Sequence, residues 1–432
     1  MLGWEFPPII SGGLGLASQG LSQALAKLTK LCMIVPSAEG IRFPLPSELI
    51  SLTKLSKQTA EALNPQEFPF IQAAESHIQS LSTYLSPYQS EQLEEELQAA
   101  TFAKSTPGNK QGIHKLLTNS SQISFQLKEA YGHDLLSQFL HYSKLAVQLA
   151  LTKTFDLIHA HDWLTFLAAI ELKQQTGKPL VLHIHALEYD RGGPDRKGWV
   201  YELEKYAMQE ADLIIAVSSY TAQIISSRYE IDADKIISIH NGLTATHPYK
   251  KDTAFPEKLI LFMGRITAQK GPQTFLKSAK ELLKTRQDVR FVMAGEGDLK
   301  KIMMQEVARF RLGDRFHFTG FLEREKVYDL LSMADICVMP SHSEPFGLVA
   351  LEAAAFGLPT VISQYSGVAE VLHHAPKVEP SEIRQITGEV LRLLEDETHR
   401  ERLGKQLQED AKGMSWEKAA EKVMHVYGQL LK

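Results

Sequence analysis

Short apolar runs alternate with helical stretches along the sequence, and this alternation limits the folds open to the chain. The apolar runs are residues 32–35, 156–160, 180–185, 213–217 and 236–239 in the first half, and 259–263, 290–294, 336–339 and 360–363 in the second. Short apolar strands separated by helices are typical of parallel sheets with helices on both faces. The two sets of strands predict an α/β fold with two doubly wound, Rossmann-like domains.

The length of the chain also favours two domains. A single hydrophobic core rarely grows beyond roughly 250–300 residues, and this chain has 432. A polar break at 247–252 separates the two sets of strands, so we expect domains at 1–246 and 247–414, followed by a terminal helix at 415–432. Residues from about 45 to 130 are rich in Ser, Gln and Glu, and we interpret them as a helical and loop insertion of open function.

Composition argues against several classes of function. The net charge is −5 without a basic stripe, which disfavours nucleic acid as a partner. No run approaches the ~20 apolar residues of a membrane helix, and the first residues do not resemble a signal peptide. Cys32 and Cys337 lie in apolar runs rather than in a disulfide framework, so we expect a cytoplasmic protein. Peripheral contact with a membrane stays open, and the sequence leaves the oligomeric state undetermined.

Two glutamates flank a predicted helix start in the second half of the chain. Glu344 precedes Pro345-Phe346-Gly347, and Glu352 lies one turn inside the helix that follows. Pro and Gly at the opening leave backbone N–H groups at the helix start able to face an anion. Carboxylates would repel that anion and are better suited to hydroxyl groups, so the run predicts a site for a nucleotide sugar. An ordinary capped helix with two solvated acids is the alternative.

A second cluster lies at the strand-to-helix turn after residues 259–263. Gly264-Arg265 follows the predicted strand, and Lys270-Gly271 precedes a helical pattern at 273–284. In open α/β sheets, ligands bind at the carboxyl ends of the strands. Arg as a fork and Lys as a point charge can together hold a diphosphate without a metal. Solvated cations at a helix start are the alternative interpretation.

At this point the chain resembles a known family. Gly264-Arg265-x4-Lys270-Gly271 together with Glu344-x7-Glu352 is similar to the nucleotide-sugar half of the retaining glycosyltransferases of family 4, related to glycogen and starch synthases. Three N-terminal segments are similar to glucan-synthase motifs: Gly3-Trp4-Glu5-Phe6-Pro7-Pro8, Ser11-Gly12-Gly13-Leu14-Gly15 and His159-Ala160-His161-Asp162-Trp163. The resemblance covers most of the chain apart from about 45–130. It implies a GT-B fold, in which two Rossmann-like domains face each other across a cleft and the helix at 415–432 crosses back to the N-terminal domain.

The resemblance assigns most donor contacts to the second domain. It implies that Glu352 accepts from ribose hydroxyls, that Arg265 and Lys270 neutralise the diphosphate, and that Glu344 holds sugar hydroxyls near the anomeric carbon. Further donor-binding residues that it implies are Gly264, Phe346, Gly347, Leu348 and Val349.

In the first domain the resemblance brings a glycine loop and two polar residues to the donor sugar or acceptor. The loop carries Gly12, Gly13 and Gly15, and the polar residues are Asp162 and His185. The resemblance also implies that Asn241 contacts the sugar and that the backbone of Gly295 lies near the nucleobase. For both positions, an ordinary turn residue is an equally good interpretation.

The implied reaction is transfer of a hexose, glucose by preference, from UDP- or ADP-sugar to a carbohydrate acceptor, with retained configuration and neither cofactor nor metal. A departing phosphate oxygen takes the proton from the acceptor hydroxyl, and no protein nucleophile is needed. The N-terminal motifs favour a glucan or oligosaccharide acceptor. A lipid-linked or other small acceptor is the alternative.

Two hypotheses lie outside this class. His159 and His161, and likewise His183 and His185, are two residues apart on predicted strands, which allows a metal-dependent hydrolase with these side chains as ligands. The second hypothesis is an inactive sugar-binding relative. It arises because only two residues precede Gly3 here, whereas the family has a longer apolar run, so we expect a shortened first strand in the acceptor domain.

Overall fold

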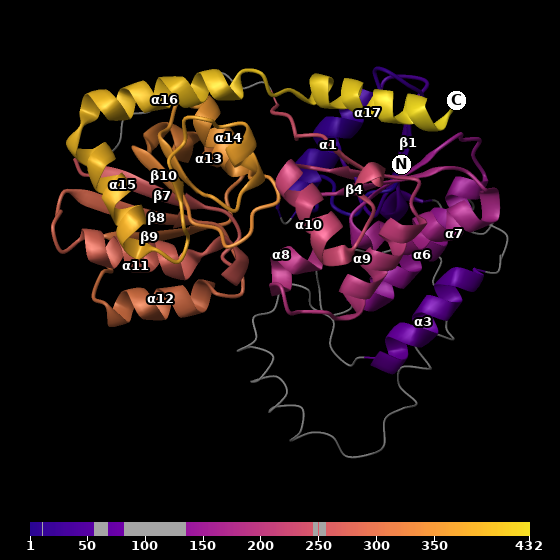
Figure 1. Cartoon of the computed structure of the whole chain (residues 1–432), viewed down its shortest axis with the longest axis horizontal. Coiled ribbons are helices and arrows are strands. Elements are labelled where there is room, and N and C mark those ends of the chain that lie inside the picture. Colours follow the sequence, from indigo (N-terminus) through magenta and orange to yellow (C-terminus); the bar gives the residue numbers. More distant parts are fainter. Residues whose placement is uncertain (11, 56–67, 82–134, 245–248, 250–255) are drawn as a thin grey trace, which may run out of the picture. The chain divides into compact units, whose positions relative to one another are not determined.

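The computed structural model describes residues 1–10, 12–55, 68–81, 135–244, 249 and 256–432. These residues divide into two units. The first unit comprises 1–183, 197–214 and 424–432, and the second comprises 184–196 and 215–423. Both contain parallel strands combined with helices, as the alternation of apolar runs predicts (Figure 1).

A six-stranded parallel sheet, in the order β12-β11-β10-β7-β8-β9, forms the centre of the second unit. All four apolar runs expected in this half are strands: β7 (Lys258–Met263), β8 (Val289–Ala294), β10 (Ile336–Met339) and β11 (Thr360–Ser363). The outer strands β9 (Phe316–Gly320) and β12 (Lys377–Val378) were not expected. Polar residues interrupt β9 and β12 is two residues long, so neither forms an apolar run.

The order of these strands creates a switch point in the sheet. From β7 the chain moves outward through β8 to β9, then returns to β10 beside β7 and moves outward the other way through β11 to β12. Because crossover connections are right-handed, the helices after β7 and β8 lie on the opposite face from the helix after β10. Ligands bind outside the carboxyl ends of the strands at such a point. The expected site therefore lies between the ends of β7 and β10.

Six longer helices belong to the sheet of the second unit, and their packing fixes the chain around the switch point. The predicted helix at 273–284 is α11, which begins at Pro272 after Gly271. Gly271 has φ +70°, and a β-carbon there would lie 2.2 Å from the carbonyl oxygen of Pro340 behind β10, so only glycine fits. The helices are α11 (Pro272–Leu282), α12 (Lys300–Arg309), α13 (Arg324–Met333), α14 (Leu348–Ala355), α15 (Ile383–Glu395) and α16 (Glu397–Ala411).

The first unit contains a second parallel arrangement. Its strands are β1 (Cys32–Val35), β2 (Glu48–Ser51), β3 (Ile158–His161) and β4 (Leu180–Ile184), and β1 pairs with β2. Leu2 forms parallel bridges to Ile34 in β1 and to Ala160 in β3, so the first residues act as a very short strand between them. A four-stranded sheet has the order β3-β4-β5-β6; β5 (Leu213–Ala216) contains the unit boundary after residue 214, and β6 (Ile236–Ser238) belongs to the second unit.

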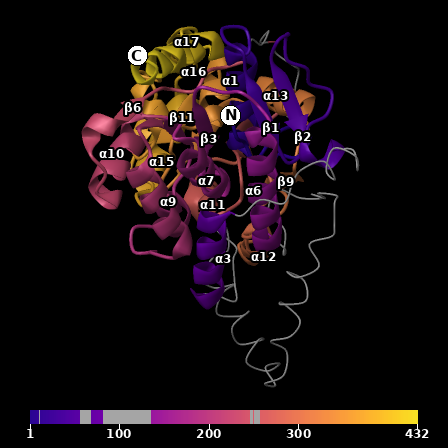
Figure 2. The same ribbon diagram turned by 90° about the vertical axis from the view of Figure 1, so that its right-hand side faces the viewer.

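Helices surround the strands of the first unit, and α3, α6 and α7 pack against one another (Figures 1 and 2). The first helix, α1 (Gly13–Leu25), begins within the glycine loop. The others are α3 (Pro69–Leu81), α6 (Leu135–Leu151), α7 (Phe166–Thr176) and α9 (Trp199–Glu210). Within the expected insertion, β2 and α3 are described, and the remaining residues up to 130 mostly lie outside the described part of the chain.

The last helix, α17 (Trp416–Leu430), is the terminal helix expected at 415–432. Oγ of Ser415 accepts a hydrogen bond of 3.3 Å from the backbone N–H of Lys418. Residues 424–432 belong to the first unit, where the hydroxyl of Tyr427 lies 2.6 Å from Nδ1 of His159 in β3.

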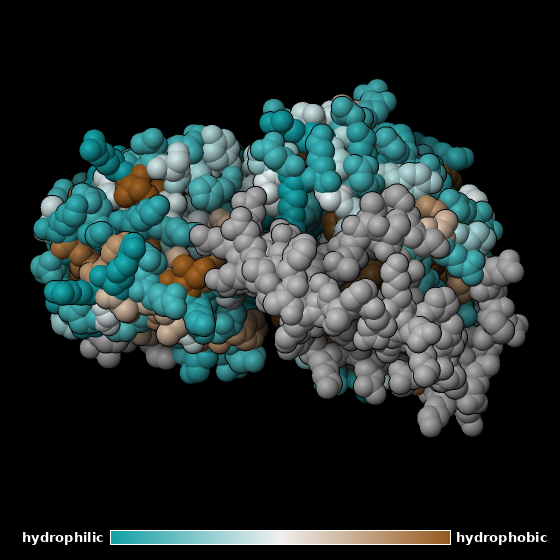
Figure 3. Space-filling model, turned by 90° about the horizontal axis from the view of Figure 1, so that it is seen from below, coloured by the Kyte–Doolittle hydropathy of each residue, from teal (hydrophilic) through white to brown (hydrophobic). Residues whose placement is uncertain are grey.

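Hydrophobic side chains are scattered over the face of the molecule that Figure 3 shows. This face is mostly hydrophilic, with hydrophobic residues in small separate patches (Figure 3). Among the described residues, no helix has the length and apolar content needed to cross a bilayer.

Candidate active site

Three glycines line the carboxyl ends of neighbouring strands in the second unit. Gly264 follows β7, Gly295 follows β8 and Gly320 ends β9, with φ of +147°, +138° and +73°. The N–H of Gly295 donates to the carbonyl of Gly320 at 3.0 Å, and the N–H of Gly264 donates to the carbonyl of Ala294 at 3.0 Å. A β-carbon on Gly295 would lie 1.9 Å from the carbonyl oxygen of Gly264. The sheet therefore presents bare backbone at the edge where a ligand is expected.

Lys270 and Glu344 meet at the switch point. Lys270 ends the short 3₁₀ helix η4 (Ala268–Lys270) behind β7, and Glu344 lies in the loop behind β10. The Lys270 Nζ lies 2.7 Å from both carboxylate oxygens of Glu344, and Ser341 Oγ donates to the same carboxylate at 3.1 Å. Glu344 is only 5% exposed. Two residues singled out separately in the sequence thus form one nearly buried ion pair.

The loop that carries Glu344 is held on both sides. Its backbone N–H donates to the carbonyl of Tyr365 at 2.9 Å, and its carbonyl accepts from the N–H of Gly367 at 2.9 Å. Phe346 is buried, and its carbonyl accepts from the N–H of Val368 at 2.6 Å. These bonds fix the direction in which the Glu344 side chain leaves the loop.

Gly347 turns the loop into α14. It adopts φ +107° as the residue before the helix, and its carbonyl accepts from the N–H groups of Ala350 and Leu351. The N–H groups of Gly347, Leu348 and Val349 belong to the turn that opens the helix and cannot bond within it. The helix dipole adds partial positive charge at this end, so an anion is stabilised there.

Glu352 is also paired. Its carboxylate lies 2.7 Å from Nη1 of Arg324, the first residue of α13. Burial raises the pKa of Glu352, and the charge and hydrogen bond of Arg324 oppose that shift. Arg324 was not singled out from the sequence, because an arginine at a helix start is common and its partner lies in another helix.

Side chains from two further segments of the second unit support the Glu344 loop. In α10 (Ser219–Tyr229) and the residue before it, the hydroxyls of Ser218 and Thr221 donate to the carbonyl of Pro345 at 2.6 and 3.1 Å. Asp190 in α8 (Glu188–Gly192) accepts from the hydroxyl of Ser343, which lies 3.1 Å from the hydroxyl of Tyr220. Burial raises the pKa of Asp190, and the bond from Ser343 lowers it. Sequence spacing carried no signal for these long-range contacts.

His185, Asn241 and Arg265 belong to the second unit as well. His185 and Asn241 are buried, and Arg265 is half-buried behind Gly264. Burial lowers the pKa of His185 to about 3, so its imidazole is neutral at physiological pH.

The remaining predicted residues lie in the first unit. Gly12 and Gly13 open α1, and a β-carbon on Gly15 would lie 2.1 Å from the Ile10 side chain, so the helix start packs closely on the preceding loop. Asp162 follows β3 with φ +56°, a conformation that non-glycine residues rarely adopt. It is buried, and its N–H donates to the carbonyl of His183 at 3.1 Å. Strain of this kind is concentrated at functional sites.

Three of the four histidines considered as metal ligands form a buried cluster in the first unit. His159 and His161 lie on β3 and His183 on β4, with ring nitrogens within 4.8 Å of one another. The rings stack at centroid distances of 4.6, 5.4 and 5.1 Å with interplanar angles of 11°, 19° and 22°. Imidazole lone pairs lie in the ring plane, so nearly parallel rings do not aim them at one point as a tetrahedral zinc site requires. The arrangement is that of packed core histidines.

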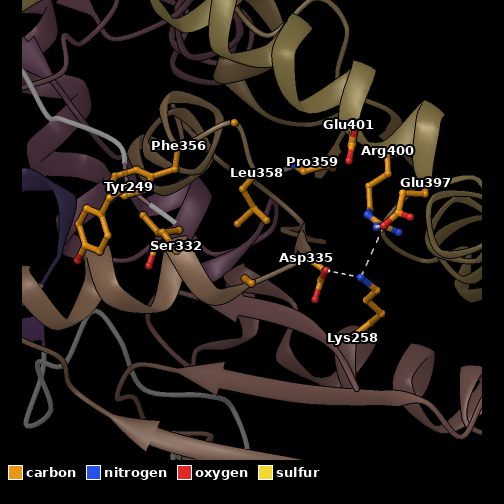
Figure 4. Close-up of a pocket in the computed structure, with 13 residues that line it drawn as sticks. Tyr249, Lys258, Ser332, Asp335, Phe356, Leu358, Pro359, Glu397, Arg400 and Glu401 are labelled. Carbon is orange, nitrogen blue, oxygen red and sulfur yellow. Dashed lines mark hydrogen bonds and ion pairs between the residues drawn. The ribbon is translucent and has the colours of Figure 1, made fainter. Parts of the chain in front are cut away.

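A hollow of about 180 Å³ lies elsewhere on the second unit (Figure 4). Lys258 and Asp335 line it at the starts of β7 and β10, together with Leu358 and Arg400. Its charged groups bond one another; for example, Lys258 lies 3.1 Å from Asp335. This is the amino-terminal edge of the sheet, opposite the glycines and the Lys270–Glu344 pair.

Comparison with known proteins gives two family matches. The family Glycosyltransferase Family 4 matches residues 106–246, and the family Glycosyl transferases group 1 matches residues 247–410. An uncharacterised glycosyltransferase of Methanocaldococcus jannaschii is 30% identical over 296 residues, which cover 63% of this chain and 75% of the relative. Glycogen synthase of Mycobacterium tuberculosis is 27% identical over 410 residues, which cover 92% of this chain and 86% of the relative.

Among solved structures, the catalytic domain of starch synthase IV from Arabidopsis thaliana, bound to ADP and acarbose, matches with a TM-score of 0.67. The two share 15% identity, and the match covers 100% of this chain and 98% of that one. At this identity the likeness concerns the fold, and it confirms the α/β fold class with two Rossmann-like domains. With the family matches and the 30% identical relative, the chain belongs to the glycosyltransferases of group 1 and family 4, enzymes of the GT-B fold related to the glycogen synthases.

Proposed function

We propose that this glycosyltransferase moves glucose from UDP-glucose or ADP-glucose to an α-glucan or oligosaccharide, retaining the anomeric configuration without a metal ion. The observation that carries the proposal is the Lys270–Glu344 pair at the switch point, beside the start of α14. It places a cation and a carboxylate within 2.7 Å of each other, next to helix N–H groups suited to phosphate.

The diphosphate is the group best matched to the positive charges of the site. Arg265 and Lys270 both follow β7, and the N–H groups of Gly347, Leu348 and Val349 open α14. Lys270 Nζ carries three N–H groups and can contact a phosphate oxygen while it holds Glu344. Departure of the nucleoside diphosphate is then stabilised by fixed charge, the role that a divalent ion has in other transferases.

The two glutamates suit the two sets of hydroxyl groups in the donor. Glu344 serves the transferred sugar, because its carboxylate is fixed by Lys270 and Ser341 on the same side as the phosphate groups. Glu352, which lies about one turn inside α14, serves the ribose. With no carboxylate posed as a nucleophile in this assignment, the acceptor attacks the face from which the diphosphate leaves, and a phosphate oxygen takes its proton.

The residues assigned to donor sugar and acceptor by resemblance complete the proposal. They are Gly12, Gly13, Gly15, Asp162, His185 and Asn241, with the Gly295 backbone near the nucleobase and Phe346 and Gly264 shaping the donor site. The neutral imidazole of His185 suits a hydrogen bond to a sugar hydroxyl. The stacking of the histidine cluster supports a metal-free reaction, because its nearly parallel rings do not converge on an ion.

The glucan acceptor rests on relatedness. The mycobacterial relative that covers 92% of this chain is a glycogen synthase, and the starch synthase of the same fold was solved with ADP and the oligosaccharide acarbose. Cys32 and Cys337 are free, which fits a reducing, cytoplasmic compartment.

The test is product formation from radiolabelled UDP-glucose and ADP-glucose with glycogen or maltooligosaccharides. We expect label in the glucan, with retained configuration by NMR of the first product. Asp162→Asn is expected to slow transfer to the acceptor more than it weakens donor binding. Label only in a lipid fraction would change the acceptor, whereas donor hydrolysis without transfer would indicate a sugar-binding relative. Absence of donor binding would overturn the proposal.

A further inference from the structure

Arg324 occupies a defined place beside the helix that carries Glu352. It is the first residue of α13, behind β9, so it lies at the same carboxyl-end edge of the sheet as Gly295 and Gly320. Its Nη1 lies 2.7 Å from Oε1 of Glu352, whose side chain is 9% exposed against 34% for that of Arg324. The guanidinium therefore forms the solvent-facing side of a largely buried ion pair.

An aromatic pair holds the guanidinium in this place. Nε of Arg324 donates to the hydroxyl of Tyr328 at 2.7 Å, and the guanidinium carbon lies 4.9 Å from the centre of the Tyr328 ring. The Tyr328 ring in turn stacks on Phe356, the residue directly after α14, with centroids 5.4 Å apart. Because both helices contribute to this stack, the position of Arg324 is coupled to that of α14, and little side-chain entropy remains to be lost on ligand binding.

The charge of Arg324 decides the chemistry of Glu352. Burial alone raises the pKa of this carboxyl and favours its protonated form, and Arg324 opposes that effect by its charge and its hydrogen bond. An ionised carboxylate accepts hydrogen bonds from two hydroxyls, whereas a protonated carboxyl must donate one of its own. The positive charge also offsets the repulsion between Glu352 and a nearby diphosphate.

The guanidinium also has donors left over. Of its five N–H groups, one bonds Glu352 and one bonds Tyr328, and within the described residues no further hydrogen bond of Arg324 is present. A ribose presents two neighbouring hydroxyls, and the oxygen of one can accept from Arg324 while the other hydroxyl donates to Glu352. The pair thus offers a donor and an acceptor side by side to a vicinal diol.

We propose that Arg324 is a specificity-determining residue for the nucleoside part of the donor, acting with Glu352 as a paired donor and acceptor for the two ribose hydroxyls. This inference rests on the proposed function, because it takes Glu352 as the ribose contact. It predicts that the site selects ribonucleoside diphosphates over their 2′,3′-dideoxy forms, and that Arg324 contributes to that selection.

The experiment is calorimetric titration with UDP and ADP and with their 2′,3′-dideoxy analogues, on wild type, Arg324→Ala, Arg324→Lys and Glu352→Gln. Lys326→Ala, which removes a surface ion pair from the same helix, is the matched control. We expect Arg324→Ala to weaken binding of the ribonucleotide about 10- to 100-fold, as for loss of a charged hydrogen bond. The same substitution should weaken binding of the dideoxy form much less. Arg324→Lys should bind the ribonucleotide more tightly than Arg324→Ala, and Lys326→Ala should bind it as tightly as wild type.

Steady-state kinetics separates positioning from general damage. We expect Arg324→Ala to raise KM for the nucleotide sugar while kcat at saturating donor changes less than threefold, since ribose contacts are the same in the ground and transition states. If Arg324→Ala fails to fold, Tyr328→Phe and Arg324→Lys carry the test, and both should lower ribonucleotide affinity several-fold.

Failure of the proposed function and failure of the role of Arg324 would give different results. A wild-type protein that binds neither nucleotide would remove the proposed function itself. Wild-type binding together with an unchanged ribonucleotide affinity in Arg324→Ala would remove only the role of Arg324. Equal losses for the ribo and dideoxy forms would overturn the assignment to the ribose hydroxyls.

Discussion

The Nζ atom of Lys270 lies 2.7 Å from both carboxylate oxygens of Glu344, although the two residues are 74 positions apart in the chain. They come together because β7 and β10 are neighbours at the switch point of the sheet. Neither side chain can be altered without changing the surroundings of the other. The two residues should therefore behave as one functional group.

Lys270→Met and Glu344→Gln are each expected to lower transfer by about 100- to 1000-fold, because each removes a preorganised charge from the donor site. The double variant should lose much less than the product of the two, since the residues act together. The measurement is a double-mutant cycle on kcat/KM. The exposed ion pair Lys284–Glu281 provides the control, and its variants should transfer as wild type. Strict additivity in the Lys270–Glu344 cycle would separate the two roles.

Gly295→Ala is expected to destabilise the protein. Gly295 has φ +138°, and an added β-carbon would lie 1.9 Å from the carbonyl oxygen of Gly264, so the strand end must move. Backbone strain of this kind costs about 1–3 kcal/mol. Gly388→Ala is the control, because Gly388 lies exposed inside α15 with no atom near its missing β-carbon, and alanine should stabilise it by about 0.5–1 kcal/mol. Urea unfolding of both variants measures the two effects, and a Gly295→Ala protein as stable as wild type would contradict the close approach.

His185 should make the protein less stable as the pH falls. Burial lowers its pKa to about 3 in the folded state, whereas an unfolded histidine has a pKa of about 6.5. Between these values the unfolded chain binds a proton that the folded chain does not, so the free energy of unfolding decreases as pH falls from about 6.5 towards 3. The slope from this one group reaches about 1.4 kcal/mol per pH unit.

Replacement by glutamine tests the source of that slope. Between pH 6.5 and 4.5, the free energy of unfolding of His185→Gln should decrease less steeply than that of wild type as the pH falls. The difference in slope corresponds to the uptake of up to one proton fewer on unfolding. Urea unfolding at several pH values gives both slopes. Identical slopes would mean that His185 is protonated in the folded protein.

Removal of metal ions should leave transfer unchanged, since the proposed function assigns the positive charge at the diphosphate to Arg265, Lys270 and the start of α14. The measurement is activity after dialysis against EDTA, together with metal analysis of the purified protein. Stoichiometric zinc with loss of activity on chelation would favour the cluster of His159, His161 and His183 as a metal site. In that case His161→Ala should release the zinc.

The central strands could be predicted from sequence because burial on both faces leaves an uninterrupted apolar run. Residues 32–35, 336–339 and 360–363 are strands within the predicted limits. β9 could not be predicted this way, since His317 and Thr319 interrupt it and its residues are only partly buried. The turns after β7 and β10 could be located because each follows directly on an apolar run whose end is visible in the sequence.

The partners of the site residues could not be predicted, because they depend on which strands are neighbours. Lys270 was expected at a diphosphate, and its pairing with Glu344 follows only from the order β10-β7. Arg324 has the sequence context of an ordinary helix start. Asp190 lies in a different part of the chain from Ser343, so no local pattern connects them. The sequence indicated which residues belong to the candidate site, and the tertiary packing determines how they pair.

The hydrogen bond between His159 and Tyr427 joins residues that are 268 positions apart, and both belong to the first unit. A ribosome makes the chain from its N-terminus, so β3 emerges long before the segment 424–432 that completes its surroundings. During that interval the second unit is synthesised and can fold, while His159 still lacks the tyrosine. The unit that is made first is thus finished last, and a nascent chain that has emerged as far as residue 423 would contain a complete second unit and an incomplete first one.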